Sequence, residues 1–293
     1  MQLKESLTSA LTRLTAEHVP SPRMNAELLL MFTLGCDRAY LYAHPERELT
    51  GDEQGRYDAA LAERGRGVPA QYITGHQEFW GMDLLVSPAV LIPRPETEHV
   101  IETVLKLADL EHAGVKGAGG HECPPHMVRI ADVGTGSGCI ALALAKELSG
   151  AEIHATEISA AALEIARANA VRLQLEKRIQ FHHADLLQGW SAKDFDVVVS
   201  NPPYVGESEE DQVQLEVRKY EPRDAVFAGP GGTEVIARLI PQAGAVLRPG
   251  GWLIMEISGP IAEETKRLLG AWNDVGITPD LQGIPRVARA RKP

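Results

Sequence analysis

The feature that most constrains the fold is an alternation of short apolar runs with amphipathic stretches, which begins at residue 128 and continues almost to the C-terminus. The apolar runs have the length and composition of buried strands, and the stretches between them have helical periodicity. Since strands that alternate with helices lie parallel to each other, we expect an α/β fold with a doubly wound, mostly parallel sheet. The expected strands are 128–133, 152–156, 179–183, 195–200 and 252–257, the expected helices are 138–149, 159–173, 232–246 and 261–272, and residues 276–293 can add an antiparallel hairpin.

The first 70 residues or so have the pattern of a small helical bundle. Leucines recur at helical spacing in the first helix, and Ser21 precedes a proline at the start of the second, which should end near Gly35. Thr50 and Glu53 form a capping-box pattern at the start of the third, which should end at Gly65. We therefore divide the chain into an N-terminal helical domain (1–75), a hairpin and linker (76–96) and a larger α/β domain (97–293), with a surface excursion at 111–126.

Composition limits what such a chain can bind. Its 44% hydrophobic and 24% charged residues are typical of a soluble globular protein, and no apolar run is long enough to span a bilayer. The net charge of −11 gives no general attraction to a phosphate backbone, and three cysteines are too few for a disulfide framework. We expect a cytoplasmic protein that binds neither nucleic acid nor membranes directly. His121, Cys123 and His126 lack a fourth metal ligand, so we expect no metal.

A glycine-rich turn lies between the first expected strand and helix of the α/β domain. The sequence "VRIADVGTGSGCIALALA" (128–145) places Gly134, Gly136 and Gly138 in this turn. Glycines let a backbone approach a ligand closely and present N–H groups at a helix N-terminus. The G-x-G-x-G spacing differs from the dinucleotide fingerprint, so the turn alone does not distinguish a nucleotide from a nucleoside.

Acidic residues follow the next two strands. Glu157 lies about 20 residues beyond the glycine turn, where a carboxylate can accept from both hydroxyls of a ribose. Asp185 follows the third strand, within reach of an adenine amino group. Either acid alone is better explained as an exposed loop residue or a helix cap, but together with the glycine turn they favour a nucleoside site at the carboxyl ends of the strands. The order of glycine turn, Glu157, Asp185 and Asn201 resembles that of class I S-adenosylmethionine-dependent methyltransferases.

The stretch "SNPPYV" (200–205) ends the fourth expected strand with two prolines. Alone, it is best explained as a turn, but here it faces the proposed nucleoside site. The nitrogen of a planar NH₂ group is a poor nucleophile, so catalysis must hold it in line and favour localisation of its lone pair. The side-chain carbonyl of Asn201 and the backbone carbonyl of Pro202 can accept its two N–H bonds, and Tyr204 can pack on a planar group. The motif predicts N-methylation of a glutamine amide or of adenine.

Four blocks of the sequence, 69–102, 132–145, 201–205 and 219–240, closely resemble the bacterial peptide chain release factor N5-glutamine methyltransferases, the HemK/PrmC family. The resemblance implies a Rossmann-like seven-stranded sheet, S-adenosyl-L-methionine as cofactor and a role in translation termination. The implied substrate is the glutamine of the Gly-Gly-Gln loop in class 1 peptide chain release factors, and the N-terminal domain helps to dock that partner. The implied cofactor contacts are Asp132, Gly134, Thr135, Gly136, Ser137, Gly138, Glu157, Asp185, Leu186 and Asn201, and the implied glutamine contacts are Asn201, Pro202, Pro203 and Tyr204.

The chain departs from the family pattern at Glu157, where Asp is more frequent, and at Leu186, where some members have an aromatic residue. Arg94 and Phe79 fit loop anchoring and core packing at least as well as a cofactor contact. Three other functions stay open. A ribosomal-protein glutamine methyltransferase shares the asparagine motif, although "YEPRDAVFAGPGG" (220–232) favours the release-factor branch. An adenine-N6 methyltransferase needs a basic groove that is not evident in this acidic chain. The intact Asn201 tetrapeptide argues against a non-catalytic binding protein.

Overall fold

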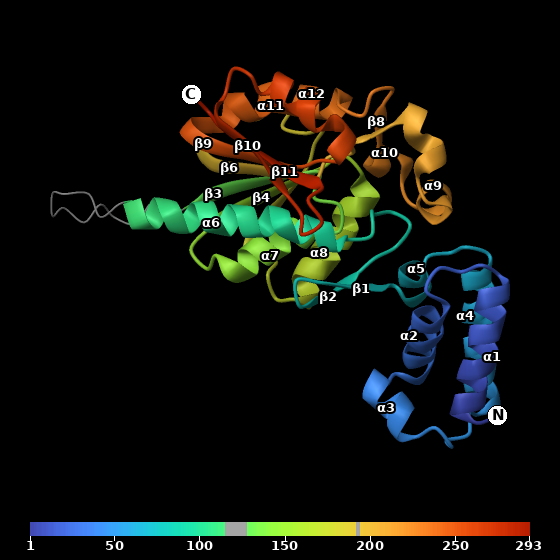
Figure 1. Ribbon diagram of the computed structural model, residues 1–293. Helices are drawn as coiled ribbons and strands as arrows, with labels where there is room; N and C mark the ends of the chain where they lie inside the picture. Colours follow the sequence, from blue (N-terminus) through green and yellow to red (C-terminus); the bar gives the residue numbers. More distant parts are fainter. Residues whose placement is uncertain (115–127, 192–193) are drawn as a thin grey trace. The chain divides into compact units, whose positions relative to one another are not determined.

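The computed structural model describes residues 1–114, 128–191 and 194–293, without the side chains of 108–114 (Figure 1). The chain forms two compact units. The helical unit comprises residues 1–76 and 214–220, and the sheet unit comprises residues 77–213 and 221–293. His121, Cys123 and His126, which were weighed above as metal ligands, lie outside the described residues together with most of the excursion at 111–126.

The helical unit consists of short helices around one apolar core, in which Leu3, Leu14 and Tyr57 are fully buried. The predicted capping box is present, since the Thr50 hydroxyl accepts from Glu53 N at 3.2 Å and the Glu53 carboxylate accepts from Thr50 N at 2.9 Å. The core forms because the helices of residues 1–76 turn apolar faces inward. The helices are α1 (Leu3–Ala16), α2 (Pro22–Leu34), α3 (Arg38–Ala43), α4 (Gly51–Gly65), α5 (Ala70–Thr74) and α9 (Leu215–Tyr220).

The ends of these helices show which local sequence signals were sufficient to predict a helix. α2 begins after Ser21 and ends at Gly35 as predicted, but Ser21 has a left-handed backbone with φ of 47° and its side chain makes no capping hydrogen bond. α3 and α5 were not predicted, because six and five residues are too few to show a periodicity. The Asp37 carboxylate caps α3 by accepting from Tyr40 N at 2.8 Å, and Gly75 ends α5 with φ of 75°.

The described strands form one seven-stranded sheet and two small two-stranded sheets. Their bounds are β1 (His76–Phe79), β2 (Met82–Leu85), β3 (Arg129–Val133), β4 (Glu152–Glu157), β5 (Ile179–His183), β6 (Phe195–Ser200), β7 (Val205–Gly206), β8 (Phe227–Gly229), β9 (Leu247–Glu256), β10 (Asn273–Pro279) and β11 (Pro285–Arg291). The large sheet has the order β10-β11-β9-β6-β3-β4-β5, in which β9, β6, β3, β4 and β5 are parallel and β11 is antiparallel to β9 and β10. The predicted doubly wound, mostly parallel α/β fold is confirmed.

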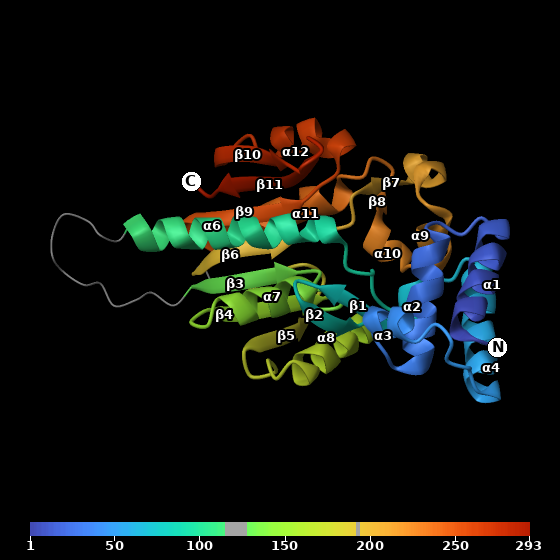
Figure 2. The same ribbon diagram turned by 60° about the horizontal axis from the view of Figure 1, so that its bottom comes forward.

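Helices cover both faces of the large sheet, as Figures 1 and 2 show. Successive residues of β3 point to opposite faces: Ile130 joins the core beneath α6, α7 and α8, and Ala131 joins the core beneath α11 and α12. No helix of the described ranges is both long and apolar enough to cross a membrane. The helices of the sheet unit are η1 (Pro95–Thr97), α6 (Glu98–Gly114), α7 (Cys139–Glu147), α8 (Ala160–Arg172), η2 (Glu207–Gln212), α10 (Arg223–Val226), α11 (Glu234–Val246), η3 (Gly259–Ile261) and α12 (Ala262–Leu268).

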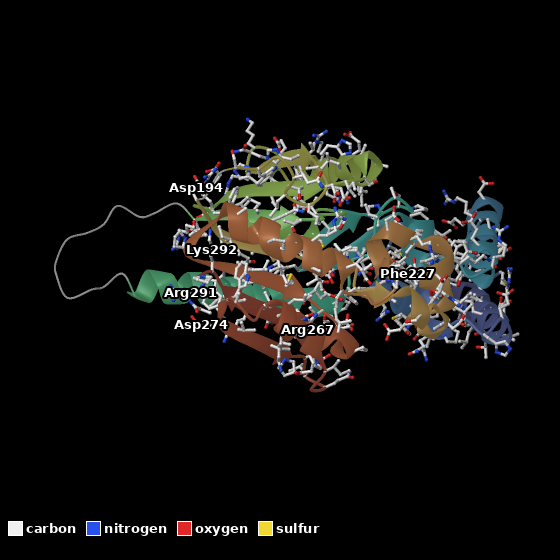
Figure 3. All side chains as sticks on the ribbon, turned by 90° about the horizontal axis from the view of Figure 1, so that it is seen from above. Asp194, Phe227, Arg267, Asp274, Arg291 and Lys292 are labelled. Carbon is white, nitrogen blue, oxygen red and sulfur yellow. The ribbon has the colours of Figure 1, made fainter. Side chains whose placement is uncertain are left out.

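The basic C-terminal tail lies at the edge of the sheet where the parallel strands begin. Arg291 pairs in register with Trp252 and contacts Asp274 at 3.9 Å, and the Lys292 ammonium donates to Leu247 O at 2.5 Å (Figure 3). These cations are therefore far from the carboxyl ends of the strands, where ligands of such sheets bind.

Candidate active site

The carboxyl ends of four neighbouring strands meet at one edge of the sheet. Val133 of β3 lies beside Thr156 of β4 and Ser200 of β6, and Ser200 lies beside Met255 of β9. The chain passes from β3 to β4 on one side and reaches β6 on the other, so the strand order reverses between β3 and β6. Ligands of doubly wound sheets bind at such a reversal. The residues that follow these strands are therefore placed to form one site.

The glycine turn after β3 leaves open space in front of its backbone. Gly134, Gly136 and Gly138 have φ of 72°, 55° and 86°, a region that L side chains rarely adopt. A Cβ at Gly134 or Gly136 would have no atom within 4 Å, whereas a Cβ at Gly138 would crowd side chains of α7 and α8. Gly134 N and Thr135 N both donate to Thr156 O at 2.9 Å, which fixes the turn to β4. The turn thus offers a rigid, open backbone surface that fits a nucleoside ligand.

Glu157 ends β4 with its carboxylate against this turn. Its Oε2 accepts from Gly136 N at 2.9 Å and its Oε1 accepts from Ser159 N at 2.9 Å, and the residue is only 8% exposed. Each carboxylate oxygen can accept more than one hydrogen bond, so both keep a lone pair for a further donor. The structure therefore brings the glycine turn together with an acceptor that fits the two hydroxyls of a ribose.

Asp132 lies behind the turn and is fully buried. Its Oδ2 accepts from the Thr135 hydroxyl at 2.6 Å and from Ala141 N at 3.1 Å, while its Oδ1 has no hydrogen-bond partner among the described residues. Burial raises the pKa of the Asp132 carboxyl to about 7, and the two hydrogen bonds oppose that shift. This carboxyl ties the turn to the first turn of α7.

Asn169 of α8 holds the same turn from another side and was not predicted. It is fully buried, and its Nδ2 donates to Ser137 O at 2.9 Å and to Leu85 O at 3.0 Å, while its Oδ1 accepts from Leu85 N at 2.7 Å. The hairpin strand β2 and the glycine turn are thus joined by one amide. The signal in the sequence was a lone asparagine on the apolar face of a predicted helix.

Asp185 and Leu186 follow β5, as predicted for residues near an adenine. The Asp185 carboxylate forms an ion pair with Arg238 of α11 and accepts from the Gln188 amide at 3.3 Å. Leu186 has φ of 53° and packs against the core beneath α11. This carboxylate thus already has a cationic partner, and a hydrogen bond from adenine to Asp185 stays a prediction.

Asn201, directly after β6, belongs to a chain of side-chain hydrogen bonds. Its Nδ2 donates to the Thr97 hydroxyl oxygen at 3.1 Å, and the Thr97 hydroxyl donates to Glu256 Oε2 at 2.6 Å. The Tyr204 hydroxyl donates to the other oxygen, Glu256 Oε1, at 3.0 Å. Between Asn201 and Tyr204 in the sequence, Pro202 is buried and Pro203 is half-buried. Sequence reasoning found Asn201 and Tyr204 but missed Thr97 and Glu256.

Burial governs the ionisation of this cluster. It raises the pKa of the Glu256 carboxyl, and the hydrogen bonds from Thr97 and Tyr204 oppose that shift. Burial also raises the pKa of the Tyr204 phenol, and the charge of Glu256 adds to this effect. Tyr204 therefore stays protonated and acts as a donor to Glu256. Neither group is free to serve as a base for a nitrogen nucleophile.

Phe79 and Arg94 have anchoring contacts. Phe79 is 2% exposed and lies in the core beneath α6 and α7. Arg94 forms an ion pair with Glu221, whose Oε2 accepts from Ile92 N at 3.2 Å. These contacts support loop anchoring and core packing for the two residues.

The fold is that of a class I S-adenosylmethionine-dependent methyltransferase, and the relatives of the chain show that S-adenosyl-L-methionine is its cofactor. Family models give the particular branch: the model described as PrmC N-terminal domain matches residues 5–75, and that described as methyltransferase small domain matches residues 122–218. The chain is 54% identical to the release factor glutamine methyltransferase of Koribacter versatilis, over 100% of this chain and 99% of that protein. It is 40% identical to that of Moorella thermoacetica, over 98% and 97%.

The chain therefore belongs to the release factor glutamine methyltransferase family, which confirms the resemblance seen in the sequence. Among solved structures, the catalytic domain of hMettl16 in complex with the MAT2A 3'UTR hairpin 1 is similar, with a TM-score of 0.53, 20% identity and coverage of 82% of this chain and 80% of that chain. A methyltransferase from Pyrococcus furiosus has a TM-score of 0.50 at 19% identity, with coverage of 72% and 89%. At such identities these similarities support the fold alone.

Proposed function

We propose that this enzyme transfers the methyl group of S-adenosyl-L-methionine to N5 of the glutamine in the Gly-Gly-Gln motif of class 1 peptide chain release factors. The observation that carries the proposal is the position of Asn201 and Pro202 directly after β6, beside the glycine turn that follows β3. The names of full-length relatives, which are release factor glutamine methyltransferases, support the choice of substrate.

S-Adenosyl-L-methionine supplies an electrophilic methyl group on a sulfonium centre. Glu157 would hold the donor's ribose, and Gly134 and Gly136 would let the backbone approach the donor, because a Cβ at either glycine would have no atom within 4 Å. At the neighbouring strand end, Asn201 Oδ1 and the Pro202 carbonyl accept the two N–H bonds of the glutamine amide. These two acceptors would orient the nitrogen lone pair and would favour the pyramidal nitrogen of the transition state.

The proposed reaction needs no side-chain base. The amide nitrogen becomes acidic once it carries the methyl group, so its proton can leave to water. The buried acid beside Asn201, Glu256, accepts the hydroxyls of Thr97 and Tyr204, which agrees with a positioning role rather than proton transfer.

We assign the helical unit to docking of the release factor. It has a core of its own, and three exposed apolar side chains, Met24, Phe32 and Tyr42 at 56%, 49% and 55%, lie on α2 and α3. α9 also belongs to this unit, although it follows the Asn201 motif in the sequence. The buried Arg64 joins α9 to the unit through Glu216 at 2.5 Å. Modification of a translation factor places the enzyme in the cytoplasm, and the substrate is a protein rather than a nucleic acid.

Mass spectrometry tests the proposal. Release factor is incubated with the enzyme and S-adenosyl-L-methionine, digested, and the Gly-Gly-Gln peptide is fragmented. The proposal predicts a mass gain of one methylene on the glutamine side chain, and a much smaller methylated fraction after the same time with the Asn201→Ala variant. Modification at another residue, or of a ribosomal protein in preference to the release factor, would refute it.

A further inference from the structure

Two buried side chains from distant parts of the chain meet behind the substrate-binding amide. Thr97 precedes α6, Glu256 ends β9, and both are 1% exposed; the side-chain hydrogen bonds of the two residues within the described part of the chain go to each other, to Asn201 and to Tyr204. We infer that Thr97 and Glu256 are positioning residues that fix which end of the Asn201 amide meets the substrate, and that they thereby select a glutamine amide over a carboxylate. The inference rests on the proposed function.

The direction of the hydrogen bonds follows from how many protons each group has. Each oxygen of the Glu256 carboxylate accepts one hydroxyl proton in the structure, Oε2 from Thr97 at 2.6 Å and Oε1 from Tyr204 at 3.0 Å. The Thr97 hydroxyl has a single proton, which it donates to Glu256. Its oxygen can therefore only accept from Asn201, which must present its NH₂ group to Thr97, as the 3.1 Å contact has it. This argument does not depend on how the amide oxygen and nitrogen are told apart.

The consequence is at the other end of the amide. With its NH₂ group bound inward, Asn201 presents only Oδ1 to the substrate site, where it is an acceptor. An amide NH₂ is attracted to this oxygen and to the Pro202 carbonyl, whereas a carboxylate is repelled by both. A flipped Asn201 would present two N–H donors, bind a carboxylate and turn its oxygen away from the methylated nitrogen. A site built to hydrogen-bond one group rejects an analogue that leaves its polar atoms unpaired.

The first test removes the hydroxyl of Thr97 in the full-length enzyme. Thr97→Val keeps the shape but loses the hydroxyl, and Thr97→Ser keeps the hydroxyl but loses the methyl group. Thr103→Val is a matched control, because Thr103 is a 7% exposed threonine of α6 whose hydroxyl donates to His99 O at 2.8 Å. We expect kcat on release factor to fall about 10-fold in Thr97→Val, with near wild-type values in Thr97→Ser and Thr103→Val. The dissociation constant of S-adenosylhomocysteine should be unchanged in all three.

The second readout is discrimination, which a merely structural role would not alter. A release factor with glutamate in place of the target glutamine is used as a competitive inhibitor. For the wild-type enzyme, its inhibition constant should be much higher than the KM of the normal factor. In Thr97→Val, where the Asn201 amide is free to flip, its inhibition constant should fall about 10-fold relative to that KM.

A second variant keeps the inference testable if Thr97→Val does not fold. Glu256→Gln has one acceptor and one donor where the carboxylate has two acceptors, so Thr97 can receive a proton and turn its own toward Asn201. Glu256→Gln should also have a lower kcat and should discriminate less between glutamine and glutamate. Wild-type kcat and discrimination in the folded variants, or an equal loss in Thr97→Ser and Thr97→Val, would overturn the inference. Failure of the wild-type enzyme to methylate the glutamine would instead refute the proposed function.

Discussion

Glu157 offers the sharpest prediction about the cofactor site. Its carboxylate is 8% exposed and accepts one backbone N–H on each oxygen, from Gly136 and Ser159. If the remaining lone pairs accept the ribose hydroxyls, Glu157→Ala removes hydrogen bonds to a charged acceptor, which contribute about 1.5–3 kcal/mol. The dissociation constant of S-adenosyl-L-methionine should then rise about 10- to 150-fold. Turnover at saturating cofactor should change less, since the groups around the glutamine amide are untouched.

Isothermal titration with S-adenosyl-L-methionine and with S-adenosylhomocysteine measures this affinity directly. Glu157→Asp keeps the charge with a shorter reach and should lose only a few-fold, because an aspartate can still accept from the ribose. Glu164→Ala removes an exposed carboxylate of α8 that pairs with Arg167 of the same helix; it is the control and should bind as the wild type does. A folded Glu157→Ala variant with wild-type affinity would refute the assignment of the ribose site.

Three further predictions concern catalysis, ionisation and the helical unit. Asn201→Ala should lower kcat on the order of 10²-fold while the cofactor dissociation constant changes little; steady-state kinetics with near-normal turnover would remove Asn201 from the mechanism. The pKa of Asp132 is raised from 3.8 to about 7, so its contribution to stability is present below pH 3.8 and lost as the pH rises through 7. In urea unfolding between pH 4 and 7, the free energy of unfolding of the wild type should fall relative to that of Asp132→Asn by up to about 1.4 kcal/mol per pH unit. A difference in free energy of unfolding that does not change with pH would contradict the raised pKa. Arg64→Met leaves the Glu216 carboxylate without its cation and should lower the free energy of unfolding by about 2–3 kcal/mol, whereas an unchanged urea midpoint would show that this pair contributes nothing.

The sequence predicted those parts of the site that depend on local patterns. The glycine turn, Glu157 and Asn201 each follow an apolar run, and parallel strands bring such positions to one edge. The bounds of long strands and helices were predicted to within a few residues, except that β9 begins at Leu247 and α12 ends at Leu268. Periodicity is informative in these elements because they are long and amphipathic.

The parts that could not be predicted depend on contacts between distant residues. Thr97 and Glu256 are 159 residues apart in the sequence, and nothing near Thr97 indicates its partner. Glu256 did carry a signal, since it ends the last parallel strand at the same edge as Asn201, and the rule applied to Glu157 would have selected it. α9 joins the helical unit although its sequence lies inside the methyltransferase part, because its Glu216 pairs with a buried arginine that only the folded structure reveals.

The most direct test of the central claim measures initial rates of tritiated methyl transfer to several acceptors side by side. The acceptors are the intact class 1 release factor, its variant with asparagine in place of the target glutamine, an isolated Gly-Gly-Gln peptide, ribosomal proteins and duplex DNA. The account predicts rapid labelling of the intact factor and a much lower kcat/KM for the peptide, because docking on the helical unit contributes binding energy that orients the amide. It predicts no labelling of the asparagine variant, whose shorter side chain withdraws the NH₂ group from Asn201 and the Pro202 carbonyl, and none of DNA. Efficient labelling of DNA or of ribosomal proteins, or equal labelling of peptide and intact factor, would contradict it.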